Sequence, residues 1–249
     1  MASSSSNVWY FAFGSNMKTD VMRRRGMTIL DAKRLCIPSH VLTFDVFGIP
    51  YNEPAMASIA RRRSSPKDPA EDRSPAVHGI GYLLSVADFQ KLVVSEGAGT
   101  AYQEVDLAAE PVSGEEEAGE VVTVRTLVSR YPFRPNPLPS QRYLDLLLQG
   151  ASEHGLPTAY QNYLASLPTY RRNLSRTEEL GSRFFLGLWM PIVNWTMRRI
   201  KTSTDSGNKQ NTGRSVIEAP TVVWLLFRAV WLHYDYLHCW LWGHGGGRR

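Results

Sequence analysis

The order of the apolar patterns along the chain constrains its fold more than any other feature. Segments with strand character fill the first half, amphipathic helices follow, and long polar excursions separate the strands. Strands are expected at 8–13, 29–36, 40–47, 55–61, 77–84, 102–108 and 120–128, and helices at 18–25, 86–95, 140–153 and 158–167. Such an irregular order predicts an α+β fold and not a regular alternation of strand and helix.

The chain of 249 residues, 43% of them hydrophobic, can bury a large core and is long for one domain. Residues 1–7 are rich in serine and are expected to be a disordered leader, not a secretory signal. Residues 8–175 are expected to form the main body and 176–249 a helical C-terminal extension. The charged, proline-containing stretch 61–75 is expected to be an exposed loop.

The net positive charge of the chain comes entirely from the extension. From Arg176 onward there are ten Lys and Arg against five Asp and Glu, whereas the preceding residues carry 18 of each sign. A neutral body argues against a general nucleic-acid surface and for a local role of the basic, Trp-rich C-terminus. The two cysteines, Cys36 and Cys239, are too few for a disulfide framework, which favours a reducing, cytoplasmic setting.

The abrupt end of the first apolar run, V-W-Y-F-A-F-G-S-N-M at 8–17, predicts either a simple turn or an anion site. Gly14-Ser15-Asn16 stands between a strand and a helix, where exposed backbone N–H groups can hold a carboxylate or a phosphate. The stretch lacks the lysine of a phosphate-binding P-loop and the glycine spacing of a dinucleotide fingerprint. Both readings stay open on these residues alone.

Glu96 is the candidate acid–base residue. It follows the apolar run Leu92-Val93-Val94, so partial burial would raise the pKa of its carboxyl group toward that of a general acid and base. The glycines at 97 and 99 would let a substrate come close. The alternative is an exposed glutamate at the end of a helix. No metal-ligand spacing, phosphate-binding loop or dinucleotide fingerprint occurs, so neither a metal nor an organic cofactor is expected, and without a G-x-S-x-G motif a serine hydrolase is not expected either.

Three motifs in order make the chain resemble the γ-glutamylcyclotransferase family over about residues 8–170. They are Y-F-A-F-G-S-N-M at 10–17, S-E-G at 95–97 with a Tyr-bearing strand after it, and Q-R-Y-L-D-L-L-L-Q-G-A-S-E-H-G-L-P-T-A-Y-Q-N-Y-L at 141–164. The resemblance implies a compact mixed β-barrel with flanking helices and one pocket. Such enzymes cyclise a γ-glutamyl amide, releasing 5-oxoproline and the amine.

The resemblance also implies which residues act. Glu96 matches the family's catalytic glutamate, and Tyr102 and Tyr143 match tyrosines that contact the substrate. The segment Tyr10, Phe11, Ala12, Phe13, Gly14, Ser15 and Asn16 would surround the glutamyl group, with backbone N–H groups on the α-carboxylate. Positioning the amine against its own γ-carbonyl would supply much of the rate, and one carboxylate would move the protons.

The chain departs from the family pattern at two places. Phe13 stands where the family has tyrosine, and the spacing from Glu96 to Tyr102 is one residue shorter than expected. Gly14-Ser15-Asn16 differs from the loops of the glutathione-specific and γ-glutamylamine groups, which favours the broad γ-glutamyl amino acid branch. Homologues also occur in fungal gene clusters for sulfur-bridged dipeptide toxins. The alternatives in other classes are a non-catalytic γ-glutamyl-binding module and a membrane-associated interaction protein.

The extension holds two apolar segments, 184–197 and 221–242, joined by a polar linker. The second is long enough to span a bilayer but contains Arg228 and Asp235, and each central charge costs about 2.5–3.5 kcal/mol. A Trp-rich helix lying in the membrane interface costs less. Peripheral membrane contact through 184–242 is therefore the favoured prediction, ahead of packing onto the body and of a true span.

Overall fold

The structure is a computed structural model that describes residues 7–62, 74–96, 100–112, 120–172, 174–205 and 212–247, with side chains up to Ile200 and again from Ala219. Its strands are β1 (Asn7–Ala12), β2 (Asp31–Ile37), β3 (His40–Ile49), β4 (Glu53–Arg61), β5 (Val77–Ser85), β6 (Tyr102–Pro111) and β7 (Val122–Ser129). Its helices are η1 (Ser15–Met17), α1 (Thr19–Arg24), α3 (Val86–Ser95), α4 (Gln141–Glu153), α5 (Thr158–Ser166), α6 (Arg176–Asp205), α7 (Thr212–His233), the π-helix η2 (Tyr234–His238) and α8 (Cys239–Trp242).

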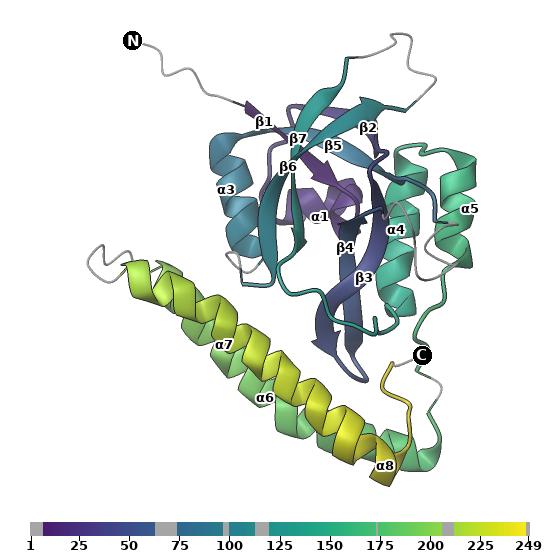
Figure 1. Ribbon diagram of the computed structural model, residues 1–249, viewed down its shortest axis with the longest axis vertical. Coiled ribbons are helices and arrows are strands. Elements are labelled where there is room, and N and C mark those ends of the chain that lie inside the picture. The colour runs from purple at the N-terminus through teal and green to yellow at the C-terminus, as the bar shows by residue number, and fades with distance from the viewer. Residues whose placement is uncertain are drawn as a thin grey trace.

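Five strands close into a mixed barrel in the order β1-β5-β2-β6-β7, and β3 and β4 form a separate hairpin. The barrel closes where β1 meets β7 in parallel, with Tyr10 opposite Arg125, whereas the other pairings are antiparallel. Helix α3 lies on one side of the barrel, and α4 and α5 lie on the other (Figure 1). The expected α+β class with a mixed barrel and flanking helices is confirmed.

Helices α3 and α4 both begin after a serine. Ser85 accepts a hydrogen bond from the Asp88 backbone N–H at 3.1 Å, and Ser140 accepts one from the Tyr143 N–H at 3.0 Å. Both serines are thus N-caps that satisfy one of the free donors of the first turn. The caps fix where α3 and α4 begin, and so they fix the positions of Glu96 at the end of α3 and Tyr143 at the start of α4.

Most expected strands lie within two residues of the observed ones. Asn7, expected in the leader, instead opens β1, and the rest of the leader lies outside the described residues. Most of the expected loop 61–75 also lies outside them, although Arg61 ends β4. Tertiary pairing explains the longer strands, since β6 continues to Pro111 where Leu35 of β2 pairs with it. Cys36 and Cys239 are free thiols, as expected.

The C-terminal extension folds as a long helical hairpin across the free end of the β3–β4 hairpin (Figure 1). A second apolar core joins them, separate from the barrel core: it contains Phe47, Ile49, Tyr51 and Phe133 of the body and Phe185, Val193, Val223, Val230, Trp231, Tyr234 and Cys239 of the extension. The fully buried Trp231 donates its indole N–H to the Gly48 carbonyl at 3.0 Å. Packing onto the body is therefore part of what the extension does.

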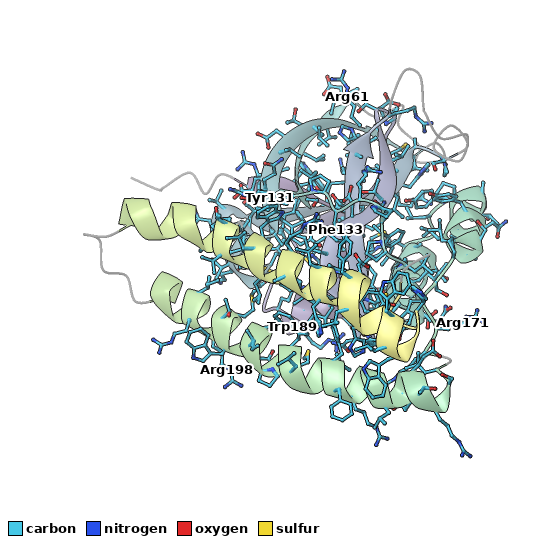
Figure 2. All side chains as sticks on the ribbon, turned by 60° about the horizontal axis from the view of Figure 1, so that its bottom comes forward. Arg61, Tyr131, Phe133, Arg171, Trp189 and Arg198 are labelled. Atoms are coloured by element: carbon cyan, nitrogen blue, oxygen red, sulfur yellow. The ribbon has the colours of Figure 1, made fainter. Side chains whose placement is uncertain are left out.

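The helices of the extension are longer than the two apolar segments of the sequence. Helix α6 runs for 30 residues through Pro191, and α7 begins before 221 and contains Pro220. Trp189 lies between α6 and α7, where its indole donates to His233 Nδ1 at 2.8 Å (Figure 2). Within the described residues, no helix combines the length and the apolar run that crossing a membrane requires.

Candidate active site

Glu96 ends α3 as its C-terminal cap, with its backbone N–H donating to the Leu92 carbonyl at 3.0 Å. Its side chain is 19% exposed and reaches two donors through Oε1. Asn16 Nδ2 lies 2.9 Å from that oxygen, and Arg25 Nη1 lies 2.7 Å from it. A carboxyl group so placed is largely buried and held from two sides, which is unlike a freely rotating glutamate at a helix end.

Gly14, Ser15 and Asn16 form the turn that leads from β1 into η1. A Cβ added at Gly14 would lie 3.1 Å from Tyr143 Oη, so glycine allows the turn to pass close to this hydroxyl. The first N–H groups of a helical turn have no partner within the turn itself, and the Ser15 N–H interacts with the Tyr143 hydroxyl. All three residues line the same cavity as Glu96.

Asn16 links the turn to the catalytic candidate. Its side chain is buried, and Nδ2 donates both to Tyr10 Oη at 3.0 Å and to Glu96 Oε1 at 2.9 Å. Its Oδ1 atom is buried without a hydrogen-bond partner among the described residues. An unpaired buried acceptor costs free energy, and a donor supplied by a ligand would remove that cost.

Three tyrosines surround the Glu96 carboxylate. Tyr143 Oη accepts the Ala57 N–H at 3.1 Å, and Tyr102 Oη donates to the Ala57 carbonyl at 3.3 Å. Burial, reinforced by the charge of Glu96, raises the pKa of Tyr10 and Tyr102 well above the ordinary value, and burial raises that of Tyr143 to about 12. The three hydroxyls therefore stay protonated at neutral pH and act as hydrogen-bond groups, not as bases.

Two adjoining cavities meet at Glu96. The inner cavity, of about 100 Å³, is lined by Tyr10, Phe13, Gly14, Ser15, Asn16, Arg25, Met56, Ala57, Glu96, Tyr102, Leu127 and Tyr143. The outer cavity, of about 400 Å³, is lined by Val93, Glu96, Tyr102, Gln103, Glu104, Leu127 and Arg130. Glu96, Tyr102 and Leu127 belong to both, so a molecule that fills both cavities must pass the Glu96 carboxylate.

The structure brings together most of the residues predicted for the site. Tyr10, Phe13, Gly14, Ser15, Asn16, Glu96, Tyr102 and Tyr143 all line the inner cavity. Phe11 and Ala12 do not line it: both are almost completely buried in the barrel core, so neither side chain reaches the cavity surface. The glycines after Glu96 lie outside the described residues.

Arg25 is the site residue that sequence reasoning missed. It caps the C-terminal end of α1, donates to Ser95 Oγ at 2.6 Å and pairs with Glu96. The only sequence signal was the basic run 23–25 soon after the Gly14 turn. Three adjacent arginines look equivalent in a sequence, and only the geometry of α1 singles out the third.

Comparison with known proteins places the chain in a family. The model of the AIG2-like family matches residues 76–164, and that of the AclK C-terminal domain matches residues 175–241. The γ-glutamyl cyclotransferase gliK of Aspergillus fumigatus is 38% identical over 97% of this chain and 90% of its own length. The γ-glutamyl cyclotransferase aclK of Aspergillus oryzae is 32% identical over 96% and 90%. The chain belongs to the γ-glutamyl cyclotransferase family.

A solved structure titled γ-glutamyl cyclotransferase shares the fold with a TM-score of 0.53 at 21% identity. The match covers 97% of that chain but only 71% of this one, whereas the two fungal relatives match almost the whole of this chain. The barrel is thus shared with that solved structure, and the extension is shared with the fungal relatives.

Proposed function

We propose that this chain cyclises the γ-glutamyl group of γ-glutamyl amino acids or peptides, glutathione and its conjugates included, to 5-oxoproline. Glu96 is the general base and then the general acid. The observation that carries the proposal is the position of Glu96: it is the only carboxylate among the described residues of the inner cavity. Membership of the family supports the reaction class, and the geometry supports the residue.

The first step is removal of a proton from the substrate's α-ammonium group by the Glu96 carboxylate. Asn16 Oδ1, buried and unpaired, is a second acceptor for that group beside Glu96. Arg25 holds the carboxyl group in place for this step, because its guanidinium lies 2.7 Å from Oε1. The neutral amine then attacks the γ-carbonyl carbon of the same molecule and closes the five-membered ring.

The second step is loss of the amine half. The proton that Glu96 accepted passes to the leaving nitrogen as the amide C–N bond breaks. The ring nitrogen still carries one proton more than a lactam does, and Glu96 passes that proton to the released amine, so that the products are 5-oxoproline and an ammonium group and the carboxylate returns to its ionised form. Tyr143 Oη accepts from the Ala57 N–H, which leaves its own proton free to donate to a substrate oxygen. The backbone N–H groups of the Gly14-Ser15-Asn16 turn are proposed to hold the α-carboxylate, which would share the Ser15 N–H with Tyr143 Oη.

The experiment that tests the proposal is incubation of the purified full-length protein with γ-glutamyl-alanine and with glutathione, followed by measurement of 5-oxoproline. Release of 5-oxoproline from either substrate is the expected result. If folded protein binds the substrates in calorimetry but releases no 5-oxoproline, the chain is a binding module and the enzymatic proposal is wrong.

We also propose that residues 8–175 are the catalytic body and that the extension, 176–249, makes peripheral contact with anionic membranes. The supporting observation is the apolar surface of the extension away from its packed side. Phe184 and Trp195 of α6 are 62% and 61% exposed, and Tyr236 and Trp240 near the C-terminus are 77% and 79% exposed. Exposed aromatic surface of this extent marks an interaction site.

The charge beside this surface favours an anionic lipid surface as the partner. Exposed arginines lie along α6, among them Arg176, Arg183, Arg198 and Arg199, and Figure 2 shows Arg171 and Arg198 toward opposite ends of that helix. Each such residue near an anionic membrane contributes about 1 kcal/mol, and aromatic rings insert at headgroup depth.

Vesicle sedimentation tests this second proposal. The full-length protein is expected to sediment with phosphatidylserine-containing vesicles but not with phosphatidylcholine vesicles, and a Tyr236→Asp, Trp240→Asp variant should lose the binding. Val121→Asp, which changes a 60% exposed valine beside the barrel, is the matched control. If the wild type ignores vesicles, or if the two substitutions instead abolish a concentration-dependent dimer, membrane contact is ruled out.

A further inference from the structure

The outer cavity has no part in closing the 5-oxoproline ring, yet it opens directly from the residue that would catalyse the closure. Glu96 must reach both the α-amine and the leaving nitrogen, so the bond that breaks has to lie beside its carboxylate. The glutamyl half takes the inner cavity of about 100 Å³. The amine half must then extend away from it, and the outer cavity of about 400 Å³ shares Glu96, Tyr102 and Leu127 with the inner one.

The walls of the outer cavity come from helix α3 and from the β6–β7 pair. Helix α3 supplies Val93, and the β6–β7 pair supplies Glu104 and Leu127, which face each other in register. Val93 and Leu127 offer apolar contact to a side chain. The surface is therefore mixed, as expected of a subsite that binds an amino acid or a peptide.

Arg130 is the only cation among the described residues that line the outer cavity. It follows β7 directly, and its backbone N–H donates to the Ala101 carbonyl at 2.9 Å, which fixes the start of the side chain. In the described part of the chain, no carboxylate lies within 4.0 Å of its guanidinium. The guanidinium is available to an anionic group of a ligand.

We propose that the outer cavity binds the amine half of the substrate and that Arg130 pairs with the free carboxylate of the amino acid or peptide that is released. This inference rests on the proposed cyclotransferase activity. A γ-glutamyl amino acid ends in a carboxylate that a guanidinium recognises through paired N–H groups. The cavity thus selects γ-glutamyl amino acids and peptides over γ-glutamyl amines, which lack this carboxylate.

Glu104 strengthens the discrimination. It lines the same cavity as Arg130. After removal of the arginine, the charged residues left among the described lining are the two glutamates, Glu96 and Glu104. An anionic amine half would then lose its partner and be repelled as well. A neutral amine half would feel neither effect. The difference in turnover between a substrate with an anionic amine half and one with a neutral amine half therefore measures recognition of the carboxylate charge.

The test compares γ-glutamyl-alanine with γ-glutamyl-alaninamide, which differ only in the terminal carboxylate. The wild type, Arg130→Gln and Arg125→Gln are assayed as full-length proteins. Arg125 is the matched control, because it lies on β7, the strand that Arg130 follows, but pairs with the exposed Asp106 at 2.8 Å and does not line the outer cavity. Substitution of an exposed arginine changes stability little, so the variants should fold.

Arg130→Gln is expected to lower kcat/KM for γ-glutamyl-alanine about fivefold to tenfold, mainly through KM, because the contact lies away from the reacting bonds. The alaninamide should be turned over as by the wild type, and Arg125→Gln should resemble the wild type on both substrates. Equal effects of Arg130→Gln on the two substrates, or none, would overturn the assignment. A wild type that turns over neither substrate would instead refute the cyclotransferase proposal.

Discussion

The barrel site and the C-terminal extension both gather aromatic side chains, but only the barrel site places them around a carboxylate. In the barrel, Tyr10, Tyr102 and Tyr143 line one cavity together with Glu96. In the extension, Phe185, Trp231 and Tyr234 pack edge to face, and the cavity of about 330 Å³ beside Phe185 has no carboxylate among its described lining residues. The same residue types therefore accompany a candidate acid–base group in one region and stabilise packing in the other.

The difference appears in the hydroxyl and indole hydrogen bonds. Tyr143 receives a backbone N–H and keeps a proton for a ligand, whereas Trp231 gives its only proton to the Gly48 carbonyl. A substitution in the first region should therefore change turnover with little effect on stability. A substitution in the second should change stability with little effect on the chemical step.

The largest expected effect is on turnover, from Glu96→Gln. The amide keeps the shape and the contact with Asn16 but cannot move protons, so kcat should fall about 10²- to 10⁴-fold with γ-glutamyl-alanine. The melting temperature should stay within a few degrees of the wild type. Glu104→Gln, a carboxylate of the outer cavity, is the control and should keep most of the activity. An active Glu96→Gln enzyme would show that another group moves the protons.

The next effect is on stability, from Trp231→Ala. The side chain is fully buried and hydrogen-bonded, so its loss should reduce the free energy of unfolding by about 3–5 kcal/mol. Turnover per folded molecule at low temperature should change little. Trp240→Ala, at a 79% exposed position, should cost less than about 0.5 kcal/mol in the same denaturant titration. Equal midpoints for the two variants would mean that the extension does not stabilise the body.

A smaller effect is expected from Arg25→Ala, which removes one of the two donors that hold Glu96 Oε1. A loosely held base is misplaced for much of the time, and kcat/KM should fall about tenfold. Arg25→Lys should restore part of the loss through kcat. Arg24→Ala, whose Nε contacts only the Asp20 carbonyl of its own helix, should leave activity unchanged. A loss shared by both alanine variants would point to the fold of α1 and not to the positioning of Glu96.

The smallest effect is a pH dependence of stability in the extension. Burial, with the neighbouring His233, lowers the pKa of His238 from 6.5 to about 4. Between these values the unfolded chain binds a proton that the folded chain does not, so the stability present above pH 6.5 is lost as the pH falls toward 4. Besides His233, the rings of Tyr51 and Phe185 face His238. The readout is the denaturant midpoint at several pH values.

The control for the pH effect uses two further variants. His238→Phe should flatten the fall in midpoint below pH 6.5, because the group that titrates is gone, whereas the exposed His244→Gln should leave it unchanged. If His238→Phe shows the same slope as the wild type, other groups control the acid sensitivity.

The sequence alone determined the α+β class, most of the strands and the starts of α3 and α4, and it singled out the Gly14 turn and Glu96 as candidates. These features depend on neighbouring residues. Ser85 caps a helix by accepting the backbone N–H of Asp88, three residues further along the chain. Gly14 lets the Tyr143 hydroxyl come close because it has no side chain. Family resemblance joined the motifs into one site, because their order along the chain is itself a long-range pattern.

Only the tertiary structure decided how distant parts meet. The pairing of Arg25 with Glu96 joins residues from separate elements, and nothing local distinguishes Arg25 from the two arginines before it. The same holds for the extension, whose apolar residues gain similar free energy from lipid or from protein contact. Packing of Val223, Val230 and Trp231 against the body assigned one face of the extension to the core, because burial depends on which surfaces the chain brings together.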